Sequence, residues 1–146
     1  MRTKRRIATL IASTALLVGG TVTTGAGTAA ADPNFTFEVD NVSSNGTFSV
    51  VAYNNGRYAG MAHWNADPVA YSPGDAMHAV DALADGWGIE AILQSPYRFA
   101  TTVGHDSPYI TPWKTGNLPE GQKVKMRVAV TRGGATHLSS YYTGHA

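Results

Sequence analysis

Hydrophobic and polar residues alternate along two clear segments of this chain. Residues 35–40 are Phe-Thr-Phe-Glu-Val-Asp, and residues 123–130 alternate Lys, Arg or Ala with Val or Met. A period of two places successive side chains on opposite faces of a strand, one toward a core and one toward water. Both segments are therefore predicted to be half-buried β-strands, and residues 97–103 are predicted to form another strand.

Asn55-Gly56 is the strongest turn signal in the chain. Both residues tolerate positive φ, as the two-residue turns of β-hairpins require. Pairing the flanking residues across this turn predicts two faces. The first face holds Phe48, Val50, Ala52, Ala59, Met61 and His63, and the other holds Val51, Tyr53, Tyr58 and Trp64.

Asp85-Gly86 permits two interpretations. As a second hairpin turn, it makes residues 75–84 a strand and places Asp81 opposite Glu90. The alternative is a helix over residues 75–84, with Ser72-Pro73 at its start and the turn glycine at its end. We prefer the strand, because the residues after the turn continue a hairpin naturally.

A third hairpin turn is predicted at Gly133-Gly134, with residues 136–143 returning along the preceding strand and His137 opposite Val130. About seven or eight strands result, joined by turns every eight to twelve residues or so. No crossover helix is predicted. The expected fold class is all-β, a single antiparallel β-sandwich of immunoglobulin-like type.

The N-terminal residues have the three parts of a secretory signal peptide. Arg2, Lys4, Arg5 and Arg6 form a basic start, residues 7–18 are apolar, and residues 29–31 give an Ala-x-Ala exit. The apolar run is shorter than the roughly 20 residues that span a bilayer. We expect residues 1–31 to be a cleaved signal peptide and residues 32–146 to be an extracellular domain, exported by the general or the twin-arginine route.

Removal of that leader changes the charge of the protein. The whole chain has a formal net charge of +1, whereas residues 32–146 keep seven Lys and Arg against ten Asp and Glu, a net charge of −3. A mildly acidic domain is a poor candidate for binding nucleic acid or for insertion into a membrane. The chain has no cysteine, which excludes disulfides and thiolate metal sites.

Residues 104–121 form a long segment without periodicity and contain three prolines. Loops of this length in small domains are often functional. Exposed aromatic side chains can stack on sugar rings or anchor a protein partner. The candidate ligand-binding residues are the aromatic side chains of this segment and of the two predicted hairpins, Tyr53, Tyr58, Trp64, Trp87, Tyr109 and Trp113. The alternative is that these rings pack against the opposite sheet or beneath the long loop.

Two other groups could carry chemistry. Asp81 and Glu90, if directly opposite, would repel, so they could hold Ca²⁺ or act as paired catalytic carboxyl groups. The alternative is a cation such as Arg98 between them, or simple solvation. Imidazoles at His63, His78 and His137, all predicted to face inward, could bind Zn²⁺. Their spacing matches no zinc motif, so we expect these histidines to bond backbone groups and predict no metal or cofactor.

His105-Asp106-Ser107 contains the residue types of a catalytic triad, but triad members normally come from separate elements. Asp-Ser-Pro is typical of a turn, which is the interpretation we favour. The alternating cations Lys123, Lys125 and Arg127 predict a charged strand face or a protected sheet edge.

Several segments resemble small secreted actinobacterial proteins of the Streptomyces type. These are Ser72-Pro-Gly-Asp75, Ala84-Asp-Gly-Trp-Gly-Ile-Glu90, Gly104-His-Asp-Ser-Pro-Tyr109 and Leu118-Pro-Glu-Gly121, together with the leader. The resemblance implies export of a β-sandwich by a bacterium. It implies no activity and no catalytic residues.

The sequence therefore favours a secreted, non-enzymatic protein that binds an extracellular protein, possibly as an enzyme inhibitor, or a glycan. For an inhibitor, residues 104–121 would be the inserted segment, with Tyr109 and Trp113 as anchors. One alternative is a small glycan hydrolase that uses Asp81, Glu90 or Asp106. The other is a structural protein of the cell surface or spore matrix. The sequence leaves the oligomeric state open.

Overall fold

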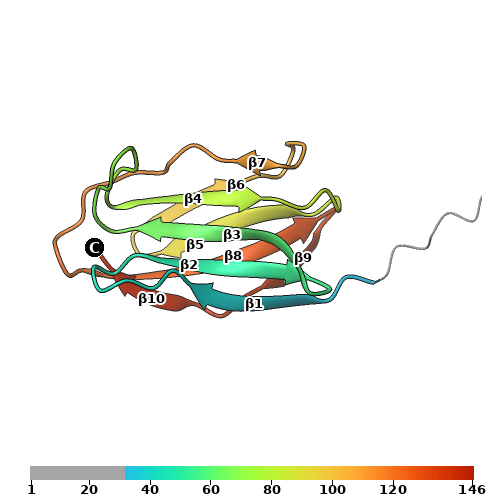
Figure 1. The fold of residues 1–146 in the computed structure, drawn as a ribbon, viewed down its shortest axis with the longest axis horizontal. Coiled ribbons are helices and arrows are strands. Elements are labelled where there is room, and N and C mark those ends of the chain that lie inside the picture. Colours follow the sequence, from blue (N-terminus) through green and yellow to red (C-terminus); the bar gives the residue numbers. More distant parts are fainter. Residues whose placement is uncertain (1–31) are drawn as a thin grey trace, which may run out of the picture. The chain divides into compact units, whose positions relative to one another are not determined.

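The computed structural model describes residues 32–146, which form ten β-strands and no helix (Figure 1). The predicted signal peptide, residues 1–31, lies outside the described residues. A strand rather than a helix occupies most of residues 75–84, as we preferred. The strands are β1 (Phe35–Asp40), β2 (Phe48–Asn54), β3 (Arg57–Asn65), β4 (Ala76–Asp81), β5 (Gly88–Gln94), β6 (Tyr97–Thr101), β7 (Tyr109–Ile110), β8 (Lys123–Arg132), β9 (Ala135–Leu138) and β10 (Tyr142–His145).

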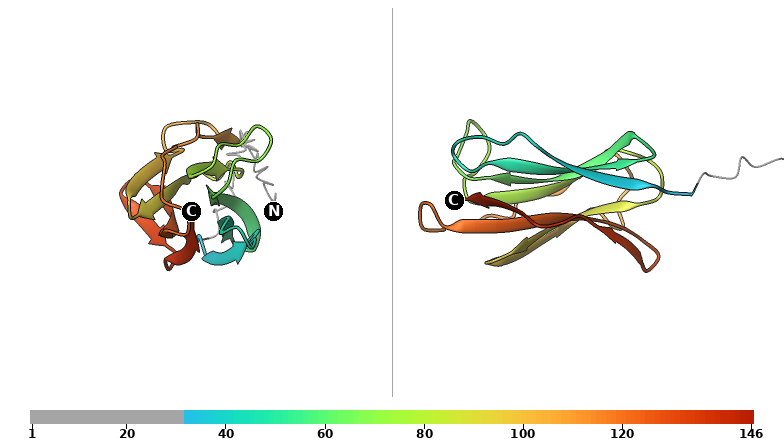
Figure 2. Two further views of the ribbon diagram at one scale, coloured as in Figure 1. Left: turned by 90° about the vertical axis from the view of Figure 1, so that its left-hand side faces the viewer. Right: turned by 90° about the horizontal axis from the view of Figure 1, so that it is seen from below.

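The strands of residues 32–146 form two antiparallel sheets of five strands each. The first sheet has the order β1-β2-β3-β4-β7. The second has the order β10-β8-β5-β6, and β9 also pairs with β8. The two sheets form separate layers, which are seen edge-on in the right-hand view of Figure 2. The all-β class and the two-sheet arrangement are thus confirmed.

The core lies between the sheets and is filled by alternate residues of their strands. Met126, Val128 and Val130 of β8 are all fully buried, as their alternation predicts. Leu93 and Ile89 of β5 and Val50 of β2 are also buried in this core. Burial of such side chains contributes roughly 1.5–3 kcal/mol each. A cysteine-free domain of this size therefore has an ordinary apolar core.

The first hairpin differs from its predicted register by one residue. Tyr53 pairs with Tyr58 next to the Asn55-Gly56 turn, but a β-bulge follows and Ala52 pairs with Gly60. The bulge inserts Ala59 into β3, so every later β3 side chain lies on the opposite face from the predicted one. Trp64 is consequently in the core and fully buried, where its indole Nε1 donates to the His145 carbonyl at 3.1 Å. Its predicted place on the ligand-binding face is wrong.

The predicted Asp85-Gly86 hairpin is also wrong. Strand β4 pairs with β3 and β7, whereas β5 pairs with β6 and β8, so the chain passes from one sheet to the other here. The turn itself forms, with the Asp85 amide donating to the Leu83 carbonyl at 2.8 Å and the Asp85 side chain accepting from the Trp87 amide at 3.0 Å. A tight turn can join two paired strands of a hairpin or two strands of different sheets, so the turn sequence does not distinguish these connections.

The C-terminal hairpin matches its prediction. Val130 of β8 pairs with His137 of β9 across the Gly133-Gly134 turn. The returning chain then breaks, and β10 pairs with the first half of β8 in a register shifted by one residue, with Tyr142 opposite Met126. Strand β8 is thus flanked by β5 on one side and by β9 and β10 on the other.

Candidate functional site

A cleft of about 390 Å³ lies at one end of the domain, where β4 and β6 end and β5 begins. Its lining includes Asp81, Trp87, Thr102, Asp106, Ser107 and Arg132. The cleft thus brings together two of the candidate carboxylates and part of the His105-Asp106-Ser107 segment. Glu90 does not line it.

Asp81 is the most buried carboxyl group of this cleft, with 2% of its surface exposed. Burial raises its pKa, an effect opposed by the Ser107 hydroxyl and the Leu83 amide and reinforced by the nearby charge of Asp85. The Ser107 hydroxyl donates to Oδ2 at 2.6 Å and the Leu83 amide donates to Oδ1 at 3.2 Å. Both carboxyl oxygens are therefore engaged: Oδ2 holds the 104–108 segment to the end of β4, and Oδ1 holds the turn that follows β4.

Trp87 forms one wall of the cleft but offers little free surface, since only 6% of the residue is exposed. The Arg132 guanidinium lies over its ring, 4.6 Å from the ring centroid. Phe35 and His137 meet the same indole edge-on, with centroid separations of 5.1 and 5.2 Å. These neighbours make Trp87 a packing residue rather than an open stacking platform.

The long 104–121 segment, here called the β4 strap, lies along the outer edge of β4. Its strand β7 pairs with the end of β4. Further along, the Thr111 amide donates to the Ala79 carbonyl at 3.0 Å, and the amides and carbonyls of Lys114 and Met77 exchange two bonds at 2.8 and 3.0 Å. The strap therefore continues the sheet irregularly instead of projecting as an inserted segment. Its prediction as an inhibitory loop has no support in this arrangement.

The β4 strap places Trp113 over two histidines on the outer face of the first sheet. His63 of β3 pairs with His78 of β4, and their ring centroids are 5.4 Å apart. The Trp113 indole stacks on His78 at 4.1 Å and meets His63 at 5.9 Å. The inward placement predicted for both histidines is wrong, because the bulge in β3 and the separate pairing of β4 put them on the outer face. His137 lies elsewhere, beside Phe35 and Trp87.

The histidine pair is held in the neutral state. Burial and the adjacent His63 lower the pKa of His78 to about 4, and burial also lowers the pKa of His63. His63 Nδ1 is bonded to the Ser49 hydroxyl at 2.8 Å. That hydroxyl belongs to a residue with no exposed surface, so the serine cannot reach a substrate. Together with Trp113 the histidine pair holds the strap on the sheet.

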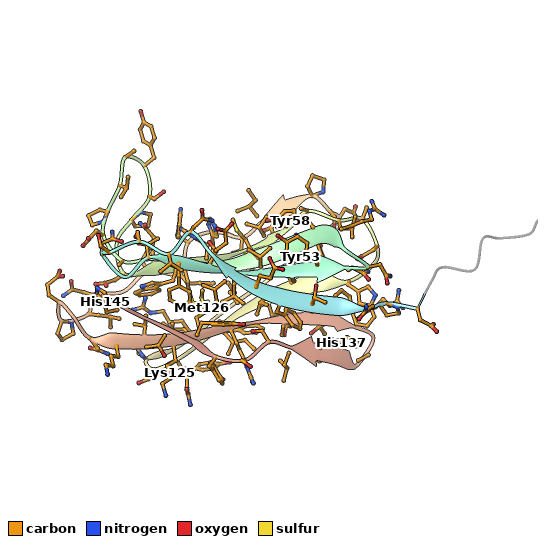
Figure 3. All side chains as sticks on the ribbon, turned by 60° about the horizontal axis from the view of Figure 1, so that its bottom comes forward. Tyr53, Tyr58, Lys125, Met126, His137 and His145 are labelled. Carbon is orange, nitrogen blue, oxygen red and sulfur yellow. The ribbon has the colours of Figure 1, made fainter. Side chains whose placement is uncertain are left out.

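The other predicted aromatic residues lie apart from this cluster. Tyr53 and Tyr58 form an edge-to-face pair at 6.3 Å near the first hairpin turn, and Tyr58 is 40% exposed (Figure 3). Tyr109 of β7 stacks on His105 at 3.9 Å within the strap. The six candidate ligand-binding residues therefore do not form one surface.

The outer face of the second sheet presents a different group of aromatic residues. We call it the open face and define it by six residues: Ile92, Tyr97, Phe99, Lys125, Arg127 and Tyr141. Ile92 pairs with both Phe99 and Arg127, so these three side chains form a row across β6, β5 and β8. Tyr97 is 71% exposed, and Phe99 and Tyr141 are 36% and 37% exposed. This row and its neighbours place three exposed aromatic side chains on one sheet.

Arg127 is the central cation of the open face. Its guanidinium lies 4.6 Å from the centroid of the Tyr141 ring. Its Nε atom is buried and has no hydrogen-bond partner among residues 32–146. Nε itself is therefore closed to a ligand, but Arg127 as a residue is only partly buried, and a stacked guanidinium can donate to an oxygen acceptor through its terminal N–H groups.

Lys123, Lys125 and Arg127 do form a charged strand face, one of the two predicted interpretations. The sheet-edge interpretation is wrong, because β8 has neighbours on both sides. Figure 3 shows Met126 between the two layers and Lys125 directed away from them. Lys123 and Lys125 are exposed and Arg127 is partly buried.

Sequence reasoning missed Tyr97, Phe99 and Tyr141. The signal for the first two was present, since Tyr97, Phe99 and Thr101 alternate with Arg98 and Ala100 and must share a face of their strand. Which face that would be depends on which sheet β6 joins. Tyr141 precedes β10 in an irregular segment, and no periodicity places it near Arg127.

No protein family, curated protein or solved structure matches this chain. Among residues 32–146, no group of three or more His, Cys, Asp or Glu side chains is placed to hold a metal ion. The same residues contain no helix long and apolar enough to cross a membrane. A function must therefore be inferred from the surfaces described above.

Proposed function

We propose that this protein is a secreted, non-enzymatic binding protein that recognises an extracellular glycan through the open face. The observation that carries this proposal is the row Phe99, Ile92 and Arg127, extended by Tyr141. It combines solvent-exposed rings with a fixed cation across neighbouring strands.

The residue types of the open face suit a carbohydrate. Pyranose rings present C–H groups on their faces and hydroxyl groups around their edges. Aromatic rings provide apolar platforms for the first, and guanidinium and ammonium groups donate hydrogen bonds to the second. Because all of these side chains except Tyr141 stand on β-strands, little backbone ordering is needed when a ligand binds.

A hydrolase is supported less well. Asp81 lies in the end cleft with both oxygens bonded. Glu90 lies on the outer side of the second sheet, where its two carboxylate oxygens accept from Thr101 and Thr131 at 3.4 Å. Asp81 and Glu90 thus do not share a site. The pair mechanism of glycoside hydrolysis requires both carboxyl groups in one site.

One observation favours a protein partner as the second candidate. Tyr71 is fully exposed at a tight turn in which Val69 and Ser72 exchange two backbone hydrogen bonds at 3.0 and 2.8 Å. Ala70 in this turn has φ of 50°, a conformation unfavourable for alanine. A rigid turn with an aromatic residue at its tip could enter a pocket of another protein. Self-association as a structural protein remains the third hypothesis.

The glycan proposal is tested by affinity electrophoresis of residues 32–146 through gels containing individual soluble polysaccharides. We expect retardation by at least one polysaccharide, with affinity lowered about tenfold or more, about 1.4 kcal/mol, in Tyr97→Ala/Phe99→Ala. Tyr58→Ala is the matched control, an exposed tyrosine on the other sheet, and should bind like the parent. Equal loss in the control, or no retardation by any polysaccharide, would contradict the proposal.

Secretion is part of the same proposal, and its support is the three-part leader, with its resemblance to Streptomyces-type exported proteins. N-terminal sequencing of the protein from culture supernatant should give Asp32 as the first residue. The immunoglobulin-like type stays a prediction. The two antiparallel sheets support it, but β1 to β4 follow one another in a single sheet, unlike the strand order of immunoglobulin domains.

A further inference from the structure

The two sheets carry opposite charge. The strands of the second sheet contain five Lys and Arg, listed as Arg98, Lys123, Lys125, Arg127 and Arg132, and a single acidic residue, Glu90. The strands of the first sheet contain Arg57 against the acids Glu38, Asp40 and Asp81. Three of the five cations of the second sheet, Lys123, Lys125 and Arg127, lie on its outer face, whereas Arg98 lies against Trp64 and Arg132 against Trp87.

Glu90 lies on the same outer face, but it is bonded to threonines and is distant from Lys125. It pairs with Ala129, which lies four residues along β8 from Lys125, roughly 13 Å at the rise of a strand, and two residues from Arg127, roughly 7 Å. Its carboxylate is bonded to Thr101 and Thr131, both at that far end. Lys123 and Lys125 are exposed, and Arg127 is partly exposed.

Rings and cations are interleaved across the open face. Phe99 and Arg127 are two strand positions apart, on either side of Ile92, which is about 10 Å at the usual strand spacing. Tyr97 pairs with Gln94 on β5. The residue before Gln94, Leu93, lies opposite Met126, so Lys125 is on β8 close to the level of Tyr97. A polymer that crosses the strands would therefore meet ring platforms on β6 and cations on β8.

We infer that the ligand of the open face is an acidic polysaccharide, whose anionic groups pair with Lys125 and Arg127 while its sugar rings lie on Tyr97 and Phe99. This inference rests on the proposed function and adds the ligand's charge. A neutral glycan would cover these cations without compensating them, whereas an anionic one complements the potential of the face. With few cations beside its rings, the open face suits a more sparsely charged polymer than duplex DNA.

The test compares acidic polysaccharides with their uncharged esters, which share the same sugar backbone. Polygalacturonate, alginate and hyaluronan are each used beside their methyl-esterified forms, and binding to residues 32–146 is measured by isothermal titration calorimetry. We expect at least one acidic form to bind about tenfold or more tightly than its ester. Binding should weaken as salt is raised, because exposed charges are screened.

Matched variants assign the effect to the open face. Lys125→Gln should lose most of the preference for the acidic form, whereas Lys114→Gln, an exposed cation of the β4 strap, should keep it. Equal binding to acid and ester, with loss in Tyr97→Ala/Phe99→Ala, would overturn the inference and leave the proposed function standing. Binding to none of the six polymers would overturn the inference, and the electrophoresis with other polysaccharides would then decide the proposed function. Tighter binding to oligothymidylate than to any acidic polysaccharide would also overturn the inference.

Discussion

Each outer face of this domain has a stacked pair of side chains, but the two pairs have opposite roles. On the first sheet, the Trp113 indole stacks on His78 at 4.1 Å and holds the β4 strap. On the second sheet, the Arg127 guanidinium lies 4.6 Å from the centroid of Tyr141. The imidazole is neutral because burial lowers its pKa to about 4, while arginine keeps its charge at any physiological pH. One pair therefore closes a surface, and the other keeps a charged surface open.

This contrast shows that the sequence around an aromatic residue does not indicate whether its side chain packs or remains exposed. Trp113 and Tyr109 belong to the longest irregular segment and looked like ligand contacts. In the structure both side chains pack along β4, because the segment that carries them is the outer neighbour of that strand. Tyr97 and Phe99 lie in an ordinary strand and remain exposed, because no segment of residues 32–146 covers them fully.

The largest effect on stability is expected from deletion of Ala59. The deletion removes the bulge that determines which side chains of β3 face the core. The chain must then either turn Trp64 out of the core or lose the Asn55-Gly56 turn. We expect a loss at least as large as the roughly 3–5 kcal/mol for a deleted buried tryptophan. Urea unfolding followed by tryptophan fluorescence measures it. A deletion variant as stable as the parent would show that the bulge does not set the faces.

Removing one ring from each face should separate stability from binding. Trp113→Ala should lower the free energy of unfolding by about 2 kcal/mol, because a partly buried indole and its histidine contacts are lost. Tyr97→Ala should change it by less than about 0.5 kcal/mol, since the side chain is exposed. Thermal denaturation compares the stability of the two variants, and the glycan titration compares their affinity. Equal stabilities would contradict the distinction between a covered and an open face.

Acid should weaken the covered face selectively. In the unfolded chain His78 binds a proton near pH 6.5, whereas in the fold its pKa is about 4, so the unfolded state holds more protons between these values. The free energy of unfolding should therefore fall as pH drops from about 6.5 to 4. His63, whose pKa is also lowered, acts in the same direction. Partial exposure of His78 reduces the size of the effect.

The variant His78→Phe isolates this contribution, because phenylalanine can stack on Trp113 without titrating. The difference in unfolding free energy between parent and variant should change with pH in that interval. The raised pKa of Asp81 affects both proteins alike and cancels. A constant difference from pH 7 to pH 4 would mean that His78 is not buried in the neutral form.

The smallest effect concerns the stacked pair of the open face. A double-mutant cycle with Arg127→Gln and Tyr141→Leu should give a coupling energy of about 0.5–1 kcal/mol, the usual size for an exposed cation–π contact. Urea unfolding of the four proteins measures it. A coupling of zero would indicate that Tyr141 does not fix the guanidinium, and the open face would then lack a preordered cation.

Features set by neighbouring residues could be predicted. The alternation of Val124, Met126 and Val128 predicts their burial, and Gly133-Gly134 predicts the pairing of Val130 with His137. Both depend on the two-residue period of a strand and on a turn that requires positive φ, which Gly133 and Gly134 adopt. For the candidate site, the alternating cations of β8 were found, but the aromatic residues beside them were not.

The amino-acid order alone thus specifies an all-β chain, the positions of most strands and turns, and which side chains of a strand share a face. It does not specify the partner of each strand. The passage from β4 to β5 between sheets, the bulge at Ala59 and the docking of residues 104–121 on β4 depend on contacts between distant segments. Such contacts arise from burial of the whole core, to which all strands contribute at once, and a one-residue change of register reverses every face. For this reason the folded chain covers Trp113 and leaves Tyr97 and Arg127 together on an open surface.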